Sequence, residues 1–318
     1  MHRLGTGVLV VLVGCVTGCS SILGIDDFKL GDAGTTSGDI LSEGAPVDAP
    51  ANCLGPAGFV VCLEPLPTTP IDFNNSATSN INTDSSPLCL ATQPPSWKAA
   101  SQPDTCFIVA TTIMFNAPTR VVGSRPIAFV ATEAIYVGAD IDVASHRGSL
   151  GAAGNSPACV VPPPGVSSTG GAGAGAGGSF MTPGGGGGAG TSAPGAGAVG
   201  PDAAQPTKLR GGCSGSHGGQ GQSTAAIAGS GGGAIYLLAG FRIAVEAAIN
   251  ASGAGGEPPG IVGGGAGGGS GGMILLHAPQ YTGAGRLLAN GGGGSGGSGG
   301  NATGASGADP NPVTPTTP

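Results

Sequence analysis

The sequence predicts an all-β protein built as a single-stranded, right-handed parallel β-helix (a solenoid), with long glycine-rich inserts and a small disulfide-bonded cap before it. Three observations favour this fold class. Short apolar segments recur four times, glycine-rich stretches separate the later copies, and cysteines and prolines gather before and around the first copy. The 67 glycines and 27 prolines among 318 residues also leave little room for long helices.

The four apolar copies align on one alanine each, namely Ala110, Ala131, Ala239 and Ala278. In each copy apolar side chains alternate with other residues over three short segments, which is the pattern of strands with one inward face. The close spacing of the first two copies matches one turn of a solenoid, where each copy buries its apolar row against the next. The alternative is a β-sandwich of unrelated strands, which would not hold four copies in register.

The expected organisation follows from these copies and from shifts in composition. It comprises a lipoprotein signal peptide at 1–18, an acidic flexible tether at 19–52, the disulfide-bonded cap at 53–105, β-helix rungs at 106–147, a glycine-rich insert at 148–230, further rungs at 231–290 with a glycine-rich loop at 252–272, and a glycine- and proline-rich tail at 291–318. Ordering glycine costs much backbone entropy, so we expect the inserts to stack beside the strands but to stay mobile.

The first residues indicate export and lipid anchoring. A basic start at Arg3 precedes the apolar run 8–13 and then Gly18-Cys19, which is the order of a secretory signal. A small residue directly before cysteine resembles the bacterial lipobox, in which the thiol of Cys19 is acylated. The alternative is an ordinary signal peptide with a chance cysteine. The polar Ser20 is typical of sorting to the outer membrane of Gram-negative bacteria, so we expect a lipid-anchored cell-envelope protein.

Six cysteines remain after the predicted cleavage besides Cys19. They are Cys53, Cys62, Cys89, Cys106, Cys159 and Cys213. An even number in an exported chain favours disulfides. The sequence leaves the pairing open, and we prefer sequential pairing because it closes the shortest loops. No Cys-x-x-Cys motif or histidine cluster accompanies them, so we expect no metal site.

Several stretches resemble the uncharacterised glycine-rich lipoproteins of the myxobacterial type. The matching stretches are Gly18 to Asp27, Gly123-Ser124-Arg125-Pro126 through Ser145-His146-Arg147-Gly148, and Ala251 to Gly256. They cover both ends and most of the predicted core. The resemblance implies a surface lipoprotein with a β-helix-like fold, and it implies no reaction.

Parallel β-helices include polysaccharide lyases and hydrolases, so the charged residues are candidates for a catalytic site. Such sites need carboxylates, alone or with Arg or Lys, converging on one face. The candidates are Asp140 and Asp142, with Arg120 and Arg242 near them in rung order. A solvated strand surface explains these residues more simply. Three histidines, His146, His217 and His277, have no evident nucleophile and acid beside them in the sequence.

The charge balance bears on the partners. A net charge of −7 with only 10 Lys and Arg argues against nucleic acid, which needs clustered cations. The many Gly-x-Gly-x-x-Gly matches lack a following helix, so they predict no cofactor. We therefore assign no catalytic residue, and expect a structural, adhesive or surface-interaction role in the envelope. The expected partners are the membrane, through the lipid anchor, and an extracellular polysaccharide or other surface proteins; a glycan-active enzyme is the alternative.

Overall fold

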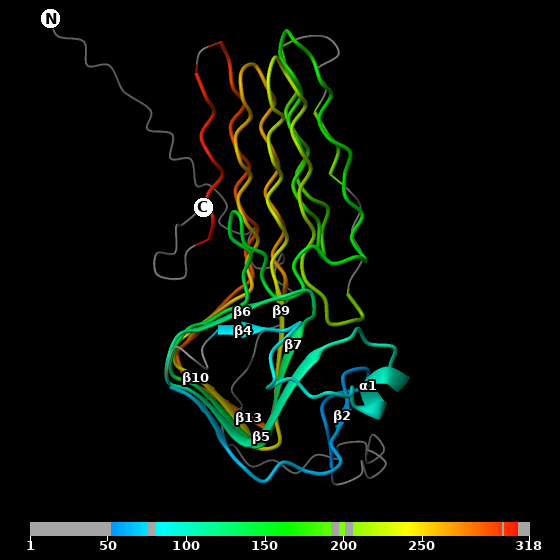
Figure 1. Cartoon of the computed structure of the whole chain (residues 1–318), viewed down its shortest axis with the longest axis vertical. Helices are drawn as coiled ribbons and strands as arrows, with labels where there is room; N and C mark the ends of the chain where they lie inside the picture. Colours follow the sequence, from blue (N-terminus) through cyan, green and yellow to red (C-terminus); the bar gives the residue numbers. More distant parts are fainter. Residues whose placement is uncertain (1–51, 75–79, 192–196, 201–205, 301, 311–318) are drawn as a thin grey trace, which may run out of the picture. The chain divides into compact units, whose positions relative to one another are not determined.

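The computed structural model describes residues 52–74, 80–191, 197–200, 206–300 and 302–310 (Figure 1). The predicted signal peptide at 1–18 and the predicted tether, except Asn52, lie outside the described residues. No helix in the described ranges combines the length and apolar character needed to cross a bilayer.

Strands are the main regular structure of the described chain, and α1 (Pro95–Ala99) is its one helix. The strands are β1 (Cys53–Leu54), β2 (Val61–Cys62), β3 (Ile71–Phe73), β4 (Asn80–Asn82), β5 (Cys106–Phe115), β6 (Thr119–Val122), β7 (Ile127–Val137), β8 (Ile141–Asp142), β9 (Ala234–Ala239), β10 (Arg242–Val245), β11 (Ala248–Asn250), β12 (Met273–His277), β13 (Gln280–Thr282) and β14 (Arg286–Leu288). β1 and β2 form an antiparallel pair. Seven strands form a parallel sheet along β12-β9-β7-β10-β13, with β5 beside β7 and β3 beside β5. Five form another in the order β14-β11-β8-β6-β4.

This topology corrects the expected fold class. The single-stranded right-handed parallel β-helix is wrong, because the described strands divide among several sheets, one of them antiparallel, and the glycine-rich stretches lie outside all of them. The physical reason is that a solenoid needs an apolar row in every turn. The sequence supplies such rows only in short segments. The glycine-rich chain between them is held by backbone hydrogen bonds instead.

The register between the copies is the one that the alanine alignment predicts. Ala110 pairs with Ala131, and Ala131 pairs with Ala239. The register shifts between Ala110 and Thr112, where β7 has one residue more than β5, and this shift absorbs the residue by which the first copy is shorter. Further along, Ile135 pairs with Ile243 in the next copy. The alignment therefore located the pairing of strands from distant parts of the sequence.

The inward row of each copy forms the main core. Ile135, Ile243, Ile141 and Ile249 are all fully buried, which confirms their predicted inward orientation. Each such side chain stabilises the fold by about 1.5–3 kcal/mol. Aromatic rings fill the core beside the first copy, where Phe115 lies 4.9 Å from Phe73 and 4.9 Å from Phe129 between ring centroids.

The outward side chains of β5, β7 and β9 form a second core under the cap. Trp97 of α1 is fully buried and packs edge-on against Phe107, with ring centroids 5.1 Å apart. Tyr236 also lies in this layer, and its hydroxyl donates to the carbonyl of Phe59 at 3.2 Å. Burial, with a smaller contribution from Tyr281, raises the pKa of Tyr236. The cap thus covers the outer face of strands that are apolar on both faces.

The glycine-rich stretches form a hydrogen-bonded layer of extended segments that run side by side (Figure 1). We call this the glycine layer; it comprises residues 165–191, 197–200, 211–233, 251–272, 289–300 and 302–308. Its hydrogen bonds recur every third residue. The amides of Gly264, Gly267 and Ser270 donate to the carbonyls of Gly219, Ser216 and Cys213 respectively, at 2.9–3.1 Å.

A three-residue repeat is the period of a polyproline II-type helix, whose backbone is free to bond its neighbours. The glycine-rich inserts stack on one another and extend away from the strands (Figure 1), so the expectation that they lie against the strands is wrong. They are joined to one another by hydrogen bonds, however, rather than lying loose. The expectation overlooked that backbone amides alone can hold such segments together when glycine lets the chains approach closely.

Candidate functional site

All six cysteines of the predicted disulfide set are bonded, in the sequential order preferred from the sequence. The pairs are Cys53–Cys62, Cys89–Cys106 and Cys159–Cys213. The second pair joins the cap to β5, and the third ties two distant parts of the long insert together. Cys19, the predicted lipidation site, lies outside the described residues, so its acylation stays a prediction.

The structure brings two of the four charged candidates together, on adjacent strands. Arg120 of β6 pairs in register with Asp142 of β8, and Asp142 pairs with Asn250 of β11. Arg120 Nη1 lies 3.0 Å from Asp142 Oδ2, which gives an ion pair between the two strands. Asn250 Nδ2 donates to Asp142 Oδ1 at 3.3 Å. Asn250 itself is buried.

His146 joins this cluster, which the sequence reasoning missed. Its Nε2 lies 2.9 Å from Asp142 Oδ2. The available signal was proximity, because only three small or apolar residues separate His146 from Asp142. The Asp142 carboxylate also accepts the amide of Ala144 at 3.0 Å, and Arg120 donates to the carbonyl of Ala144 at 2.6 Å. Because both Asp142 oxygens have donors, the cluster fixes the point where the chain leaves β8 for the insert.

The other two charged candidates lie in different surroundings. Asp140 accepts the backbone amide of Ala248 at 2.8 Å and so links two copies. Arg242 stacks over the ring of Tyr136, 5.1 Å from its centroid, and donates to its hydroxyl. The Nε atom of Arg242 is buried and has no hydrogen-bond partner among the described residues. The four candidates therefore do not converge on one site.

The two remaining histidines are also apart from this cluster. His217 lies in the glycine layer, where its Nδ1 is 3.1 Å from the carbonyl of Ala226. His277 ends β12. Among the described residues no group of three or more His, Cys, Asp or Glu is placed to hold a metal ion.

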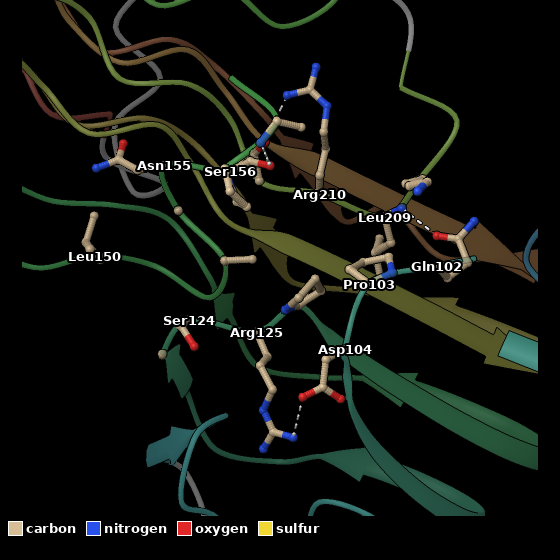
Figure 2. Close-up of a pocket in the computed structure, with 18 of the residues that line it drawn as sticks. Gln102, Pro103, Asp104, Ser124, Arg125, Leu150, Asn155, Ser156, Leu209 and Arg210 are labelled. Carbon is tan, nitrogen blue, oxygen red and sulfur yellow. Dashed lines mark hydrogen bonds and ion pairs between the residues drawn. The ribbon is translucent and has the colours of Figure 1, made fainter. Parts of the chain in front are cut away.

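A cleft of about 990 Å³ lies where four segments of the described chain meet (Figure 2). Its walls come from 101–104 of the cap, 123–126 between β6 and β7, the start of the insert around 153–158, and 208–211 near the insert's end. The sequence could not show this cleft, because its walls are far apart along the chain. It is a mixed surface, in which apolar residues alternate with amide, hydroxyl and charged groups.

The two arginines of the cleft differ in their partners. Arg125 Nη1 lies 3.7 Å from Asp104 (Figure 2). Arg125 also donates to the carbonyl of Thr83. Arg210 lies over the ring of Phe180, 4.4 Å from its centroid, and donates to the Phe180 carbonyl at 3.3 Å. Its Nη1 is 3.5 Å from the sulfur of Cys213. Burial lowers the pKa of Arg210. Arg210 thus holds the disulfide and an aromatic ring together.

The glycine layer has one close-packed side and one open side. A Cβ atom added at Gly187 would lie 2.1 Å from the carbonyl oxygen of Ala174. One added at Gly188 or at Gly185 would meet nothing within 4 Å. Gly185 and Gly188, three residues apart, are both exposed. Glycine is therefore required on the packed side, and the open side presents bare backbone.

The segment of the layer that contains Gly185 and Gly188 is also uncharged. From 148 to 201 the sequence contains no Asp, Glu, Lys or Arg. A surface of amide groups without charge suits neutral polar partners, since it offers hydrogen bonds without electrostatic attraction.

The chain matches no protein-family model, no curated protein and no solved structure.

Proposed function

We propose that this chain is a cell-envelope lipoprotein with a structural or adhesive role, and that the open side of the glycine layer contacts its partner. The observation that carries the proposal is the division of the layer into a packed side and an open side. Packing requires glycine at positions such as Gly187, but no packing demand explains the absence of side chains at Gly185 and Gly188. Their absence is explained if a partner approaches the backbone there.

An uncharged extracellular polysaccharide is the partner that this surface fits best. The carbonyls of Gly185 and Gly188 each already accept one backbone amide, so a sugar hydroxyl would use their second lone pair or accept from an exposed amide. Sugars also carry no charge that would need a counter-charge on the protein. The described part of the open side has a regular three-residue repeat, which can meet a regular polymer at several points. Another surface protein is the competing partner.

The anchoring part of the proposal concerns Cys19. Export with acylation of Cys19 would hold the whole chain at the membrane, with the acidic stretch 26–48 between the anchor and the first strand. Expression of the full chain in a Gram-negative host tests this directly. Wild type should partition with the membrane fraction, and Cys19→Ala should be released; a Cys19→Ala protein that stays with the membranes contradicts the anchor.

The contact surface is tested by placing charge on it without disturbing its packing. The double variant Gly185→Asp/Gly188→Asp adds two carboxylates where space is open. Ala91→Asp/Thr92→Asp is the matched control, because it adds the same charge at exposed residues of the cap. Thermal melts should first show that both variants fold.

The readout is retention of the full chain on immobilised neutral polysaccharide extracted from the surface of the producing cells. We expect wild type and the cap variant to be retained alike, and the layer variant to be retained about tenfold less. Equal retention of the folded layer variant would contradict the assignment of this surface. Retention lost equally in both variants would mean that overall charge, and not the open side, controls binding.

A further inference from the structure

The side chains at the two ends of the stacked strands differ in how far they are buried. At the first end, β3 and β4 bring Phe73 and Ile81, which are both buried. At the last end, the side chains of the final copy are only half covered. Tyr281 of β13 is 53% exposed and Leu287 of β14 is 51% exposed. The core is therefore closed at one end and open at the other.

The backbone shows the same contrast. β12 and β13 are the two ends of the main path of the seven-stranded sheet, and β14 is an end of the five-stranded sheet. All three strands of the final copy thus have a free edge among the described residues. A free edge is a row of unpaired amides and carbonyls that can template another strand.

Proteins that keep such edges exposed usually blunt them with charges, prolines or very short strands. The first end follows this rule, because β3 has three residues, carries Asp72 and begins directly after Pro70. β12 does not follow it. Its sequence Met-Ile-Leu-Leu-His has five residues with no acidic or basic group other than the histidine. One side chain of the same copy contacts this edge: the hydroxyl of Tyr281 donates to the carbonyl of Leu276 at 3.2 Å. Tyr281 is half exposed and must turn away for another strand to pair at Leu276.

We infer that a second copy of this chain covers the last end, joined by antiparallel pairing of β12 with the β12 strand of its partner. The register that fits is centred on Leu275, which then lies opposite the partner's Leu275. Ile274 lies opposite the partner's Leu276, and Met273 opposite the partner's His277. The pairing is self-complementary, since residues that face the main core meet residues that face it in the other copy.

Three features favour a second copy as the occupant. When β12 pairs with a second β12 about Leu275, apolar residues meet apolar residues and each His277 meets a methionine, so no like charges meet. Antiparallel pairing is at least as stable as the parallel pairing already present inside each copy. The first end is closed, so only two last ends can meet; a twofold contact of this kind closes on itself and gives a dimer, not a filament.

The dimer is tested by cross-linking at the proposed twofold axis. All six described cysteines are already in disulfides, so a cysteine introduced in β12 has only its own counterpart to react with there. Residues directly opposite in an antiparallel pair have Cα atoms about 4.5–5.5 Å apart, which is within the range of a disulfide. Leu275→Cys should therefore form a covalent dimer under mild oxidation.

Met273→Cys is the matched control, because it lies on the same strand and points to the same side as Leu275. In the proposed register its counterpart is four residues away along the paired strand, roughly 13 Å, so it should not cross-link. Light scattering of the wild-type full chain in detergent, corrected for the detergent, should give twice the mass of one chain. A monomer at every concentration overturns the inference, as does equal cross-linking of both variants or a mass that keeps growing with concentration.

Discussion

The strand core and the glycine layer pack neighbouring chain segments with different kinds of residue. Both stack chain segments side by side through backbone hydrogen bonds. The strand core fills the space between its sheets with branched and aromatic side chains such as Ile135 and Phe129. In the glycine layer a carbonyl of one segment lies against the Cα of the next, as Ala174 does against Gly187. The first region is stabilised by what its side chains bury, and the second by how closely its backbones approach.

The comparison teaches that the two regions should fail in opposite ways. Removing a methyl group harms the strand core, because it leaves a cavity. Adding a methyl group harms the packed side of the layer, because the space is already filled by backbone. A packed glycine-rich sequence can thus tolerate substitution as poorly as an aliphatic core does, although it has almost no side chains.

The largest effect is expected from the disulfide that ties the glycine layer. Cys159–Cys213 spans 54 residues, whereas Cys53–Cys62 spans nine. Loop-closure entropy assigns about 4 kcal/mol to the long loop and about 3 kcal/mol to the short one. The free energy of unfolding should therefore fall more in Cys159→Ser/Cys213→Ser than in Cys53→Ser/Cys62→Ser. Equal losses in denaturant titrations would show that the layer does not depend on its cross-link.

The strand core should respond to a shortened side chain. Ile135 is fully buried against the next copy, so Ile135→Ala should lower the free energy of unfolding by about 3 kcal/mol. Thr132, which is partly exposed on the same strand, serves as the control, and Thr132→Ala should change it by less than about 0.5 kcal/mol. Similar losses at the two positions would mean that the inward row is not the core.

The glycine layer should respond to a lengthened side chain, and two neighbouring residues separate its sides. Gly187→Ala forces a methyl group against a backbone carbonyl and should cost about 2 kcal/mol. Gly188→Ala meets open space and should be neutral or stabilise by a few tenths of a kcal/mol, roughly, through the unfolded state. Thermal melts of the two variants give the comparison. If both alanines are tolerated equally, the layer is not close-packed.

The smallest effect belongs to the junction between the two regions. The Arg120–Asp142 ion pair is partly exposed, so a double-mutant cycle with Arg120→Gln and Asp142→Asn should give a coupling of about 1 kcal/mol or less. The coupling should shrink in high salt because exposed charges are screened. A coupling of several kcal/mol, unchanged by salt, would mean that the cluster around Asp142 is a buried network.

Much of the strand pairing could be predicted from the sequence, because period-two alternation identifies inward residues without knowledge of the fold. The alignment on Ala131 and Ala239 placed Ile135 opposite Ile243 across more than a hundred intervening residues. The fold class was predicted wrongly, since alternation reports which face is buried but not how many sheets the strands share.

The rest depended on contacts that leave no local pattern. The order of the glycine layer comes from backbone bonds between distant segments, and glycine-rich sequence looks the same whether it is packed or loose. The cleft near Arg210 is likewise assembled from four separate segments. The pairing of His146 with Asp142 was open to sequence reasoning, because the two residues are close along the chain, but a strand-surface interpretation does not include the turn that follows β8.

Hydrogen exchange of backbone amides in the glycine layer tests the central claim most directly. The amides of Gly175, Gly178, Gly215 and Gly267 donate to neighbouring segments at 2.8–3.0 Å. The structure predicts that they exchange slowly, on the timescale of amides in β7. Exchange at the rate of an unstructured chain would contradict the account, because the glycine-rich segments would then be loose inserts and not a hydrogen-bonded layer.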